Sequence, residues 1–215
     1  MIHIENISIH IHPAPQPSLP SFGAALLHAI MEKGVENESG TAAEPQQGIP
    51  ADRPAIGQYW PGQGGIYAGD FLGGDGVIYG LIVADCGTVQ DIGRAPWGQN
   101  GSLALSDWDG LRNTTALIAG DSPAAKLVAK YTNDGCTDFY LPARRELLLA
   151  SANLHNRFGN ESWYWTSTPY KDGENRAWAV YVKYGYADDS IRCNDNDLRV
   201  RPFRRFIYPV ASTKI

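Results

Sequence analysis

Cysteine is scarce in this chain: there are only three, Cys86, Cys136 and Cys193, and they lie far apart. An odd number without a Cys-x-x-Cys pair excludes a zinc ribbon and argues against a disulfide framework. We therefore expect reduced thiols that are packed one by one, as is usual for proteins that fold in a cytoplasm.

Long apolar runs are also missing. No window approaches the roughly 18 apolar residues that a transmembrane helix requires, so we expect no membrane insertion. The sequence begins Met1-Ile-His-Ile-Glu-Asn, without the basic start and the apolar run of a signal peptide. We therefore expect the protein to fold in a cytoplasm.

Charged residues make up only 19% of the 215 residues, and the net charge is −5. The basic residues near the C-terminus include Arg199, Arg201, Arg204 and Arg205. A nucleic-acid surface would require such arginines to cluster on one face with exposed aromatics. Arg199 and Arg201 instead alternate with Val200 and Pro202, a pattern typical of a half-buried strand. We predict structural ion pairs here and no nucleic-acid partner.

The first 55 residues differ in composition from the rest. Residues 2–12 resemble a strand with one phase slip, and a free apolar strand requires a partner in its own chain or in a neighbouring subunit. Prolines at 13–20 predict an extended connector, and residues 21–34 a short amphipathic helix. Residues 35–55 contain almost no core-forming side chains. The predicted parts are an attachment or oligomerisation module (1–34), a flexible linker (35–55) and a ligand-binding domain (56–215).

From Ile56 onward, short strands and glycine turns alternate. Residues 64–70 and 76–84 predict a hairpin, whose second strand is apolar enough to be central and buried on both faces. Helices are predicted over 109–118, 122–130 and 142–154, the second with Ser122 as N-cap and Pro123 at its first position. Strands return at 163–168, 176–183 and 197–204. This order of elements predicts an α+β fold.

Four sequence blocks near the C-terminus carry a family resemblance. They are Gly135-Cys-Thr-Asp-Phe-Tyr-Leu-Pro-Ala-Arg-Arg-Glu-Leu, Trp163-Tyr-Trp-Thr-Ser-Thr, Ala177-Trp-Ala-Val-Tyr-Val and Leu198-Arg-Val-Arg-Pro-Phe-Arg. Three earlier segments belong to the same pattern: Gly64-Gly-Ile-Tyr-Ala-Gly, Tyr79-Gly-Leu-Ile-Val-Ala and Asp109-Gly-Leu-Arg-Asn-Thr. In this order they resemble the Lcl C-terminal domain family over residues 56–206. The resemblance implies a C-type-lectin-like domain with short strands and two to three helices, whose terminal strands come together.

The resemblance also implies a function without catalysis. Similar domains occur in phage tropism determinants and in other variable proteins of diversity-generating retroelements, where mutated adenine codons change surface residues between fixed framework positions. The implied partners are a bacterial surface receptor, either protein or glycan, further copies in a homotrimer or other homo-oligomer, and other virion proteins through residues 1–34. A phage tail is the implied setting, with synthesis in a bacterial cytoplasm and a later location in a virion or on a surface. One alternative is a bacterial adhesin or a secreted effector that binds host glycans, and a second is an enzyme of the formylglycine-generating type.

Polar and aromatic residues fill the spaces between framework positions in the last third of the chain. Tyrosine offers a large rigid contact area, and Asn, Asp and Ser offer adaptable hydrogen bonds, as in antibody paratopes. The same polar residues also favour turns. Trp165 and Trp178 are predicted to belong to the core. The predicted ligand contacts are Trp163, Tyr164, Tyr170, Asp172, Asn175, Tyr184, Tyr186, Asp188, Asp189, Ser190, Arg192, Asn194, Asp195 and Asn196.

Catalytic and metal chemistry finds little support in the sequence. Formylglycine-generating enzymes share the implied fold but need two cysteines near the C-terminal core, where this chain has only Cys193. Asp70 and Asp75 offer oxygen ligands for calcium, but no EF-hand or calcium-lectin motif accompanies them. His10 and His12 share a strand face that reads as plain polar surface more readily than as a metal site. We predict no catalytic residue, no cofactor and no bound metal.

Overall fold

The computed structural model describes residues 48, 50–98, 106–159, 161–170, 175–193 and 196–209, which all belong to one compact unit, Glu44–Ile215. The predicted strand 2–12, with His10 and His12, the predicted helix 21–34 and most of the linker lie outside the described residues. So do Asp172, Asn194 and Asp195, together with the side chains of Asp189, Ser190 and Arg192. The described part has an α+β architecture with two sheets and three α-helices.

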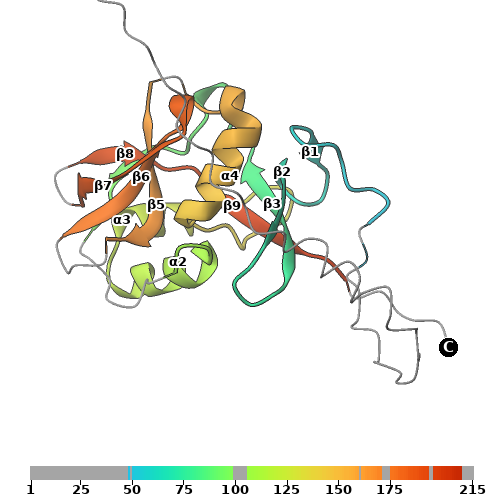
Figure 1. The fold of residues 1–215 in the computed structure, drawn as a ribbon, viewed down its shortest axis with the longest axis horizontal. Helices are drawn as coiled ribbons and strands as arrows, with labels where there is room; N and C mark the ends of the chain where they lie inside the picture. The colour runs from blue at the N-terminus through green and yellow to red at the C-terminus, as the bar shows by residue number, and fades with distance from the viewer. Residues whose placement is uncertain are drawn as a thin grey trace, which may run out of the picture. The chain divides into compact units, whose positions relative to one another are not determined.

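The first sheet brings together strands from both ends of the described chain. Its order is β1 (Tyr59–Trp60), β2 (Gly65–Leu72), β3 (Ile78–Ala84) and β9 (Phe203–Ile207), and all its pairs are antiparallel. The β2–β3 hairpin confirms the sequence prediction. β3 is central, and all of its residues after Ile78 are buried, as its apolar run predicted. Figure 1 shows β9 beside β3.

The second sheet has the order β4 (Arg94–Pro96), β8 (Asp197–Arg199), β5 (Trp163–Pro169), β6 (Arg176–Tyr181) and β7 (Tyr186–Arg192). Only β5 and β8 are parallel, through the single pair of Tyr164 and Arg199. The predicted strand 197–204 is wrong as one element, because β8 and β9 belong to different sheets and Pro202, which has no N–H to donate, lies between them.

The strand β7 contains Asp188 and its neighbours, for which turns were the alternative to ligand-binding residues. Asp and Ser disfavour strands, but β7 pairs with β6 along its length, and an edge strand accommodates polar residues well. A short 3₁₀ turn, η3 (Val182–Tyr184), joins the two strands. Tertiary pairing has therefore overridden local propensity.

Three helices follow the predicted order: α2 (Gly110–Ala119), α3 (Pro123–Val128) and α4 (Arg144–Leu154). Their caps explain where they begin. Asp109 accepts a hydrogen bond from the Arg112 N–H at 3.0 Å, and Ser122 accepts one from the Ala125 N–H at 3.2 Å. The last helix begins at Arg144 and not at Pro142. Two further 3₁₀ turns are η1 (Gly87–Val89) and η2 (His155–Arg157).

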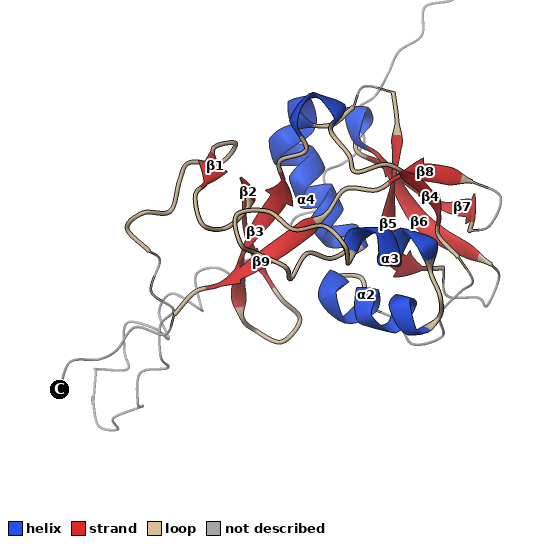
Figure 2. Cartoon of the chain, turned by 180° about the vertical axis from the view of Figure 1, so that it is seen from behind, coloured by secondary structure: helices blue, strands red, loops and turns tan. Residues whose placement is uncertain are grey.

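The helix α4 lies between the two sheets and contacts both (Figure 2). Its Leu147 and Leu154 pack in one apolar cluster with residues of β2, β3, β5 and β6. On the other face of the second sheet, α2 and α3 enclose Trp165 and Trp97. Both indoles are fully buried; Trp165 Nε1 donates to Ala95 O at 2.9 Å. The predicted core role of Trp165 is confirmed.

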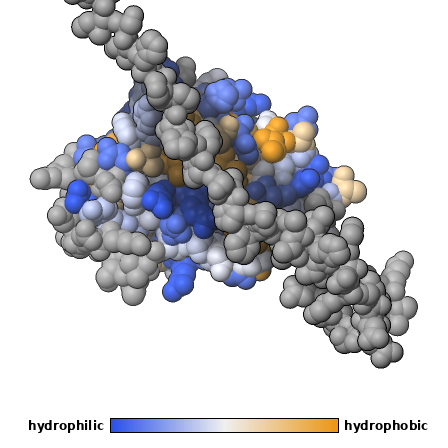
Figure 3. Space-filling model, in the orientation of Figure 1, coloured by the Kyte–Doolittle hydropathy of each residue, from blue (hydrophilic) through white to orange (hydrophobic). Residues whose placement is uncertain are grey.

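The described surface is mainly hydrophilic on the face shown in Figure 3, where hydrophobic residues appear only in small groups. Scattered apolar residues of this kind are normal on a soluble domain, whereas adjoining exposed aromatics indicate an interaction site. In the part of the chain that the structure describes, no helix has the length and apolar character needed to cross a membrane.

Candidate ligand-binding site

The C-terminal arginines lie in the framework and stabilise it. Arg199 forms an ion pair with Asp91, and the predicted structural ion pairs are thereby confirmed. Arg201 is only 2% exposed and donates to Ala84 O at 2.9 Å and to Arg157 O at 3.1 Å. We expected Arg201 on a half-buried strand; this was wrong, because its guanidinium satisfies carbonyl groups inside the molecule.

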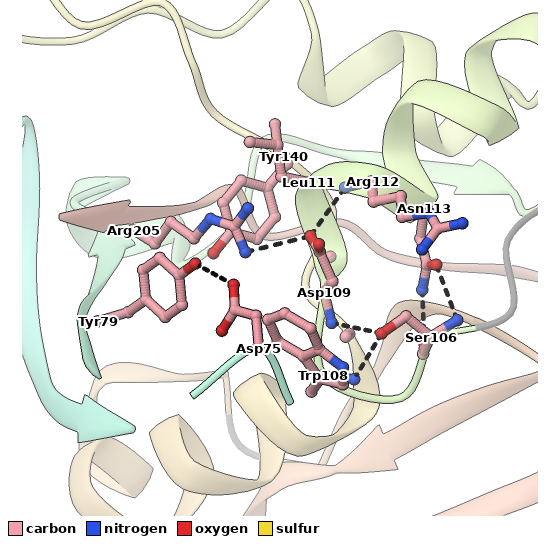
Figure 4. A network of polar contacts seen from close by, with 12 residues as sticks. Asp75, Tyr79, Ser106, Trp108, Asp109, Leu111, Arg112, Asn113, Tyr140 and Arg205 are labelled. Atoms are coloured by element: carbon pink, nitrogen blue, oxygen red, sulfur yellow. Dashed lines mark hydrogen bonds and ion pairs between the residues drawn. The ribbon is translucent and has the colours of Figure 1, made fainter. Parts of the chain in front are cut away.

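Arg205 of β9 connects the first sheet to the start of α2 (Figure 4). Its Nη1 lies 3.2 Å from Asp109 Oδ1, and its guanidinium lies over the ring of Tyr79, 4.6 Å from the centroid. Tyr79 in turn donates to Asp75 Oδ2 at 2.6 Å. Because these partners come from β3, from the turn before it and from the cap of α2, the contacts fix the sheet relative to the helix.

Four aromatic side chains form a continuous row across the second sheet, which we call the aromatic row: Trp163, Tyr181, Tyr184 and Tyr186. Trp163 on β5 is the register partner of Tyr181 on β6, which is also the partner of Tyr186 on β7. Partners directly opposite each other share one face of a sheet. The centroid of Tyr184, from the turn η3, lies 5.7 Å from that of Tyr181 and 5.6 Å from that of Tyr186. The distance from Trp163 to Tyr181 is 5.3 Å.

Exposure to solvent increases along the aromatic row. Trp163 and Tyr181 are half-buried, and Trp163 packs against the core of the domain. Tyr184 and Tyr186 are 59% and 64% exposed. The row therefore has a base fixed in the core and an outer end that presents two adjacent rings to solvent. Such rings offer a large contact area that loses little side-chain entropy on binding.

An ion pair flanks the outer end of the aromatic row. Lys183 Nζ lies 3.0 Å from Glu161 Oε1 and 5.3 Å from the centroid of the Tyr184 ring. The hydrogen bond to Glu161, followed by one to Tyr184, raises the pKa of Lys183, so its ammonium stays charged. Both side chains of the pair are substantially exposed.

A hydrogen bond from α4 stabilises the turn that carries Tyr184. Ser151 is buried, and its Oγ donates to Val182 O, the first residue of η3, at 3.1 Å. Gly185 ends the turn with a φ of 66°, a left-handed conformation that glycine adopts without strain. The sequence analysis missed both Ser151 and Tyr181. Tyr181 belongs to the block Ala177-Trp-Ala-Val-Tyr-Val, and its place in the predicted strand 176–183, three residues before Tyr184, was the available signal.

The predicted ligand contacts divide between the two ends of β6. Trp163, Tyr184 and Tyr186 meet in the aromatic row. Tyr170 and Asn175 flank the start of β6, about 17 Å away along the strand. The predicted contacts with described positions therefore do not form one patch: some form the aromatic row, and Tyr170 and Asn175 lie apart from it. Asp188, on β7, and Asn196, ahead of β8, are half-buried.

Tyr164 must be removed from the predicted contacts. Its side chain is fully buried, its hydroxyl accepts from the Gly159 N–H at 2.8 Å, and its ring packs edge-on against Phe158. Burial raises the pKa of Tyr164. Neighbouring residues in a strand point to opposite faces, so Tyr164 faces the α4 side while Trp163 and Trp165 face the other.

The groups considered for catalysis and metal binding are engaged elsewhere. Cys193 is fully buried, and burial raises the pKa of its thiol to about 12, so it forms no appreciable thiolate at neutral pH. Asp70 forms an ion pair with Arg53 at 2.5 Å and accepts from Tyr67 at 2.6 Å. Among the residues with described positions, no group of three or more His, Cys, Asp or Glu is arranged to hold a metal ion.

Trp178 was predicted as core, and the structure places it half-buried at the edge of the core. The guanidinium of Arg144 covers its ring, 4.4 Å from the centroid, and Arg144 Nη2 lies 3.4 Å from Asp107 Oδ2. This arrangement supports the framework role while leaving part of the indole in contact with solvent.

A scan against protein-family models finds no match for the chain, and a search of curated proteins finds none either.

Proposed function

We propose that the protein is a non-enzymatic receptor-binding protein that uses the aromatic row to contact a molecule on a bacterial surface. The observation that carries the proposal is the outer end of the row, where two adjacent tyrosines are each more than half exposed. Aromatic residues that are rigidly held and solvent-exposed are the usual anchors of binding surfaces. The buried thiol of Cys193 makes a formylglycine-type reaction a poor alternative.

The proposed fold is C-type-lectin-like. Two features support it beside the sequence resemblance. Strands from both ends of the described chain, β2 and β9, flank β3 in one sheet, as the resemblance implies. The sequence blocks that carry the resemblance supply the framework: Trp165 is buried, and Arg199 and Arg201 make internal contacts.

The proposed setting is a phage or prophage tail, with residues 1–34 as the attachment or oligomerisation module and a homotrimer as the working assembly. Three copies of a weak site would give useful avidity on a repetitive cell surface. A retroelement would diversify Tyr184, Tyr186 and their neighbours. A bacterial adhesin for host glycans would use the same row, and the test below includes this case.

The test compares binding of fluorescently labelled protein to a panel of bacterial strains and to immobilised host glycans, including heparin. Replacing both outer tyrosines, Tyr184→Ala and Tyr186→Ala, is expected to weaken binding to the bacterial target by at least about tenfold, because exposed aromatic anchors carry much of a binding energy. Leu72→Ala is the matched control, since Leu72 is 59% exposed on the other sheet. Unchanged binding by the double variant contradicts the proposal; binding to host glycans alone favours the adhesin.

A further inference from the structure

Lys183 makes two contacts that together describe a site for an ammonium group. Its Nζ lies 3.0 Å from Glu161 Oε1 and 5.3 Å from the centroid of the Tyr184 ring. A carboxylate supplies charge and a hydrogen-bond acceptor, and the ring face supplies the quadrupole that attracts a cation. A site of this composition accepts any primary ammonium that reaches it with the same approach.

Lys183 is held there weakly. The Lys183 and Glu161 side chains are 37% and 71% exposed, and ion pairs as exposed as this contribute little to stability. Lysine also has a long flexible stem with many accessible rotamers, so its ammonium leaves such a site at a low cost. Water and an incoming cation can therefore displace Lys183 at a low cost.

The surroundings of the site favour a cation over an anion. With the Lys183 ammonium displaced, the carboxylate of Glu161 is left beside the ring of Tyr184. This combination of negative charge and aromatic faces complements a lysine side chain on a protein.

We infer that Lys183 occupies, from within the chain, a site that takes a lysine side chain of a partner protein when the aromatic row binds. The partner's lysine displaces Lys183, pairs with Glu161 and lies against Tyr184. The inference rests on the proposed function, because both use the same row. It adds the chemical identity of one group on the partner, a lysine ammonium. In the free protein, Lys183 then competes with that group for Glu161 and Tyr184.

The inference predicts that removing the Lys183 side chain of this protein increases its affinity for an added lysine probe. The probe is Nα-acetyl-lysine methylamide, titrated into the full-length protein while the aromatic NMR resonances of the tyrosines are recorded. An internal competitor that fills its site for about four-fifths of the time lowers the apparent affinity about fivefold. Lys183→Ala is therefore expected to lower the dissociation constant of the probe about fivefold, and Glu161→Gln to raise it.

The control variant is Lys126→Ala, which changes the net charge equally and removes the exposed pair between Lys126 and Asp121 on α3. It should leave the dissociation constant unchanged. A second control is the same probe with its side-chain amine acetylated, which should not produce a saturable shift. An arginine probe that binds more tightly than the lysine probe would replace lysine by arginine as the partner's group and overturn the inference as stated.

Other results separate this inference from the proposed function. If Lys183→Ala leaves the probe's dissociation constant unchanged or raises it, Lys183 is not a competitor and the inference is overturned. Absence of a saturable shift in both wild type and Lys183→Ala overturns it as well. The proposed function survives either result as long as the Tyr184→Ala, Tyr186→Ala variant loses binding to cells, because that assay does not depend on a lysine.

Discussion

Glu146, at the start of α4, is a fully buried carboxyl group that makes two hydrogen bonds. Its Oε1 accepts from the Tyr140 hydroxyl at 2.7 Å, and its Oε2 accepts from the Ala143 N–H at 2.7 Å. Among the described residues the nearby guanidinium of Arg205 pairs with Asp109 and not with Glu146. A buried carboxylate without its own cation is costly, and protonation relieves that cost.

Burial raises the pKa of Glu146 from its ordinary 4.5 to about 8. Between these two pH values the unfolded chain has released the proton and the folded protein still binds it. The free energy of unfolding must then fall as the pH rises, by about 1.4 kcal/mol for each pH unit. The stabilisation is complete below pH 4.5 and is lost by about pH 8, for an upper bound of about 5 kcal/mol over the whole interval.

The variant Glu146→Gln tests this reasoning, because glutamine keeps the shape and can hydrogen-bond to both Tyr140 and Ala143 without titrating. We expect wild type and variant to differ little in unfolding free energy at pH 5, and the variant to be more stable by a few kcal/mol at pH 8. Urea unfolding at half-unit pH steps, followed by tryptophan fluorescence, measures the difference. Other titrating groups are the same in both proteins and cancel. Two parallel curves of stability against pH would refute the assignment of a raised pKa.

Two further substitutions probe the frame and the support of the row. In Gly110→Ala the new Cβ would lie 2.4 Å from Glu146 Oε2 and 2.7 Å from Leu141 O. We therefore expect the free energy of unfolding, measured by thermal unfolding, to fall by about 2 kcal/mol or more. Gly120→Ala is the control, because its Cβ meets nothing closer than 3.6 Å, and it should change the free energy of unfolding by about 1 kcal/mol at most. Ser151→Ala removes the hydrogen bond to Val182 O, and we expect about 1 kcal/mol lower stability together with weaker binding through Tyr184, measured in the cell-binding assay; a loss of stability alone would show that Ser151 does not position the turn.

Elements with local signals could be predicted from the sequence. The β2–β3 hairpin is marked by its glycines, and α3 by Ser122 and Pro123, which act through contacts within a few residues. The strand β7 has no such signal, since Asp188 and its neighbours are typical of turns and only pairing with β6 makes them a strand.

The candidate site was harder to predict for two physical reasons. Trp163, Tyr164 and Trp165 are all aromatic, so this part of the strand has no alternation of apolar and polar residues. Both faces of the strand pack against core clusters, and the sequence therefore does not indicate which of the three side chains reaches solvent. The predicted contacts also lie on both sides of the predicted strand 176–183, and a residue before a strand and one after it lie at opposite ends of that strand. Tyr170 and Tyr184 are close in sequence, yet β6 separates them.

The position of β9 has a consequence for the order of folding. In the first sheet, β3 cannot complete its hydrogen bonds until β9 has been synthesised. In the second sheet, β8 lies between β4 and β5 and is synthesised only shortly before β9. Neither layer of the domain can close while these late strands are still inside the ribosome. The β5–β7 meander, with its four rings, is made of neighbouring segments that can pair earlier, because local contacts form faster than distant ones. Changes to the outer rings would then leave the pairing of the late strands untouched, which would suit a surface diversified as we propose.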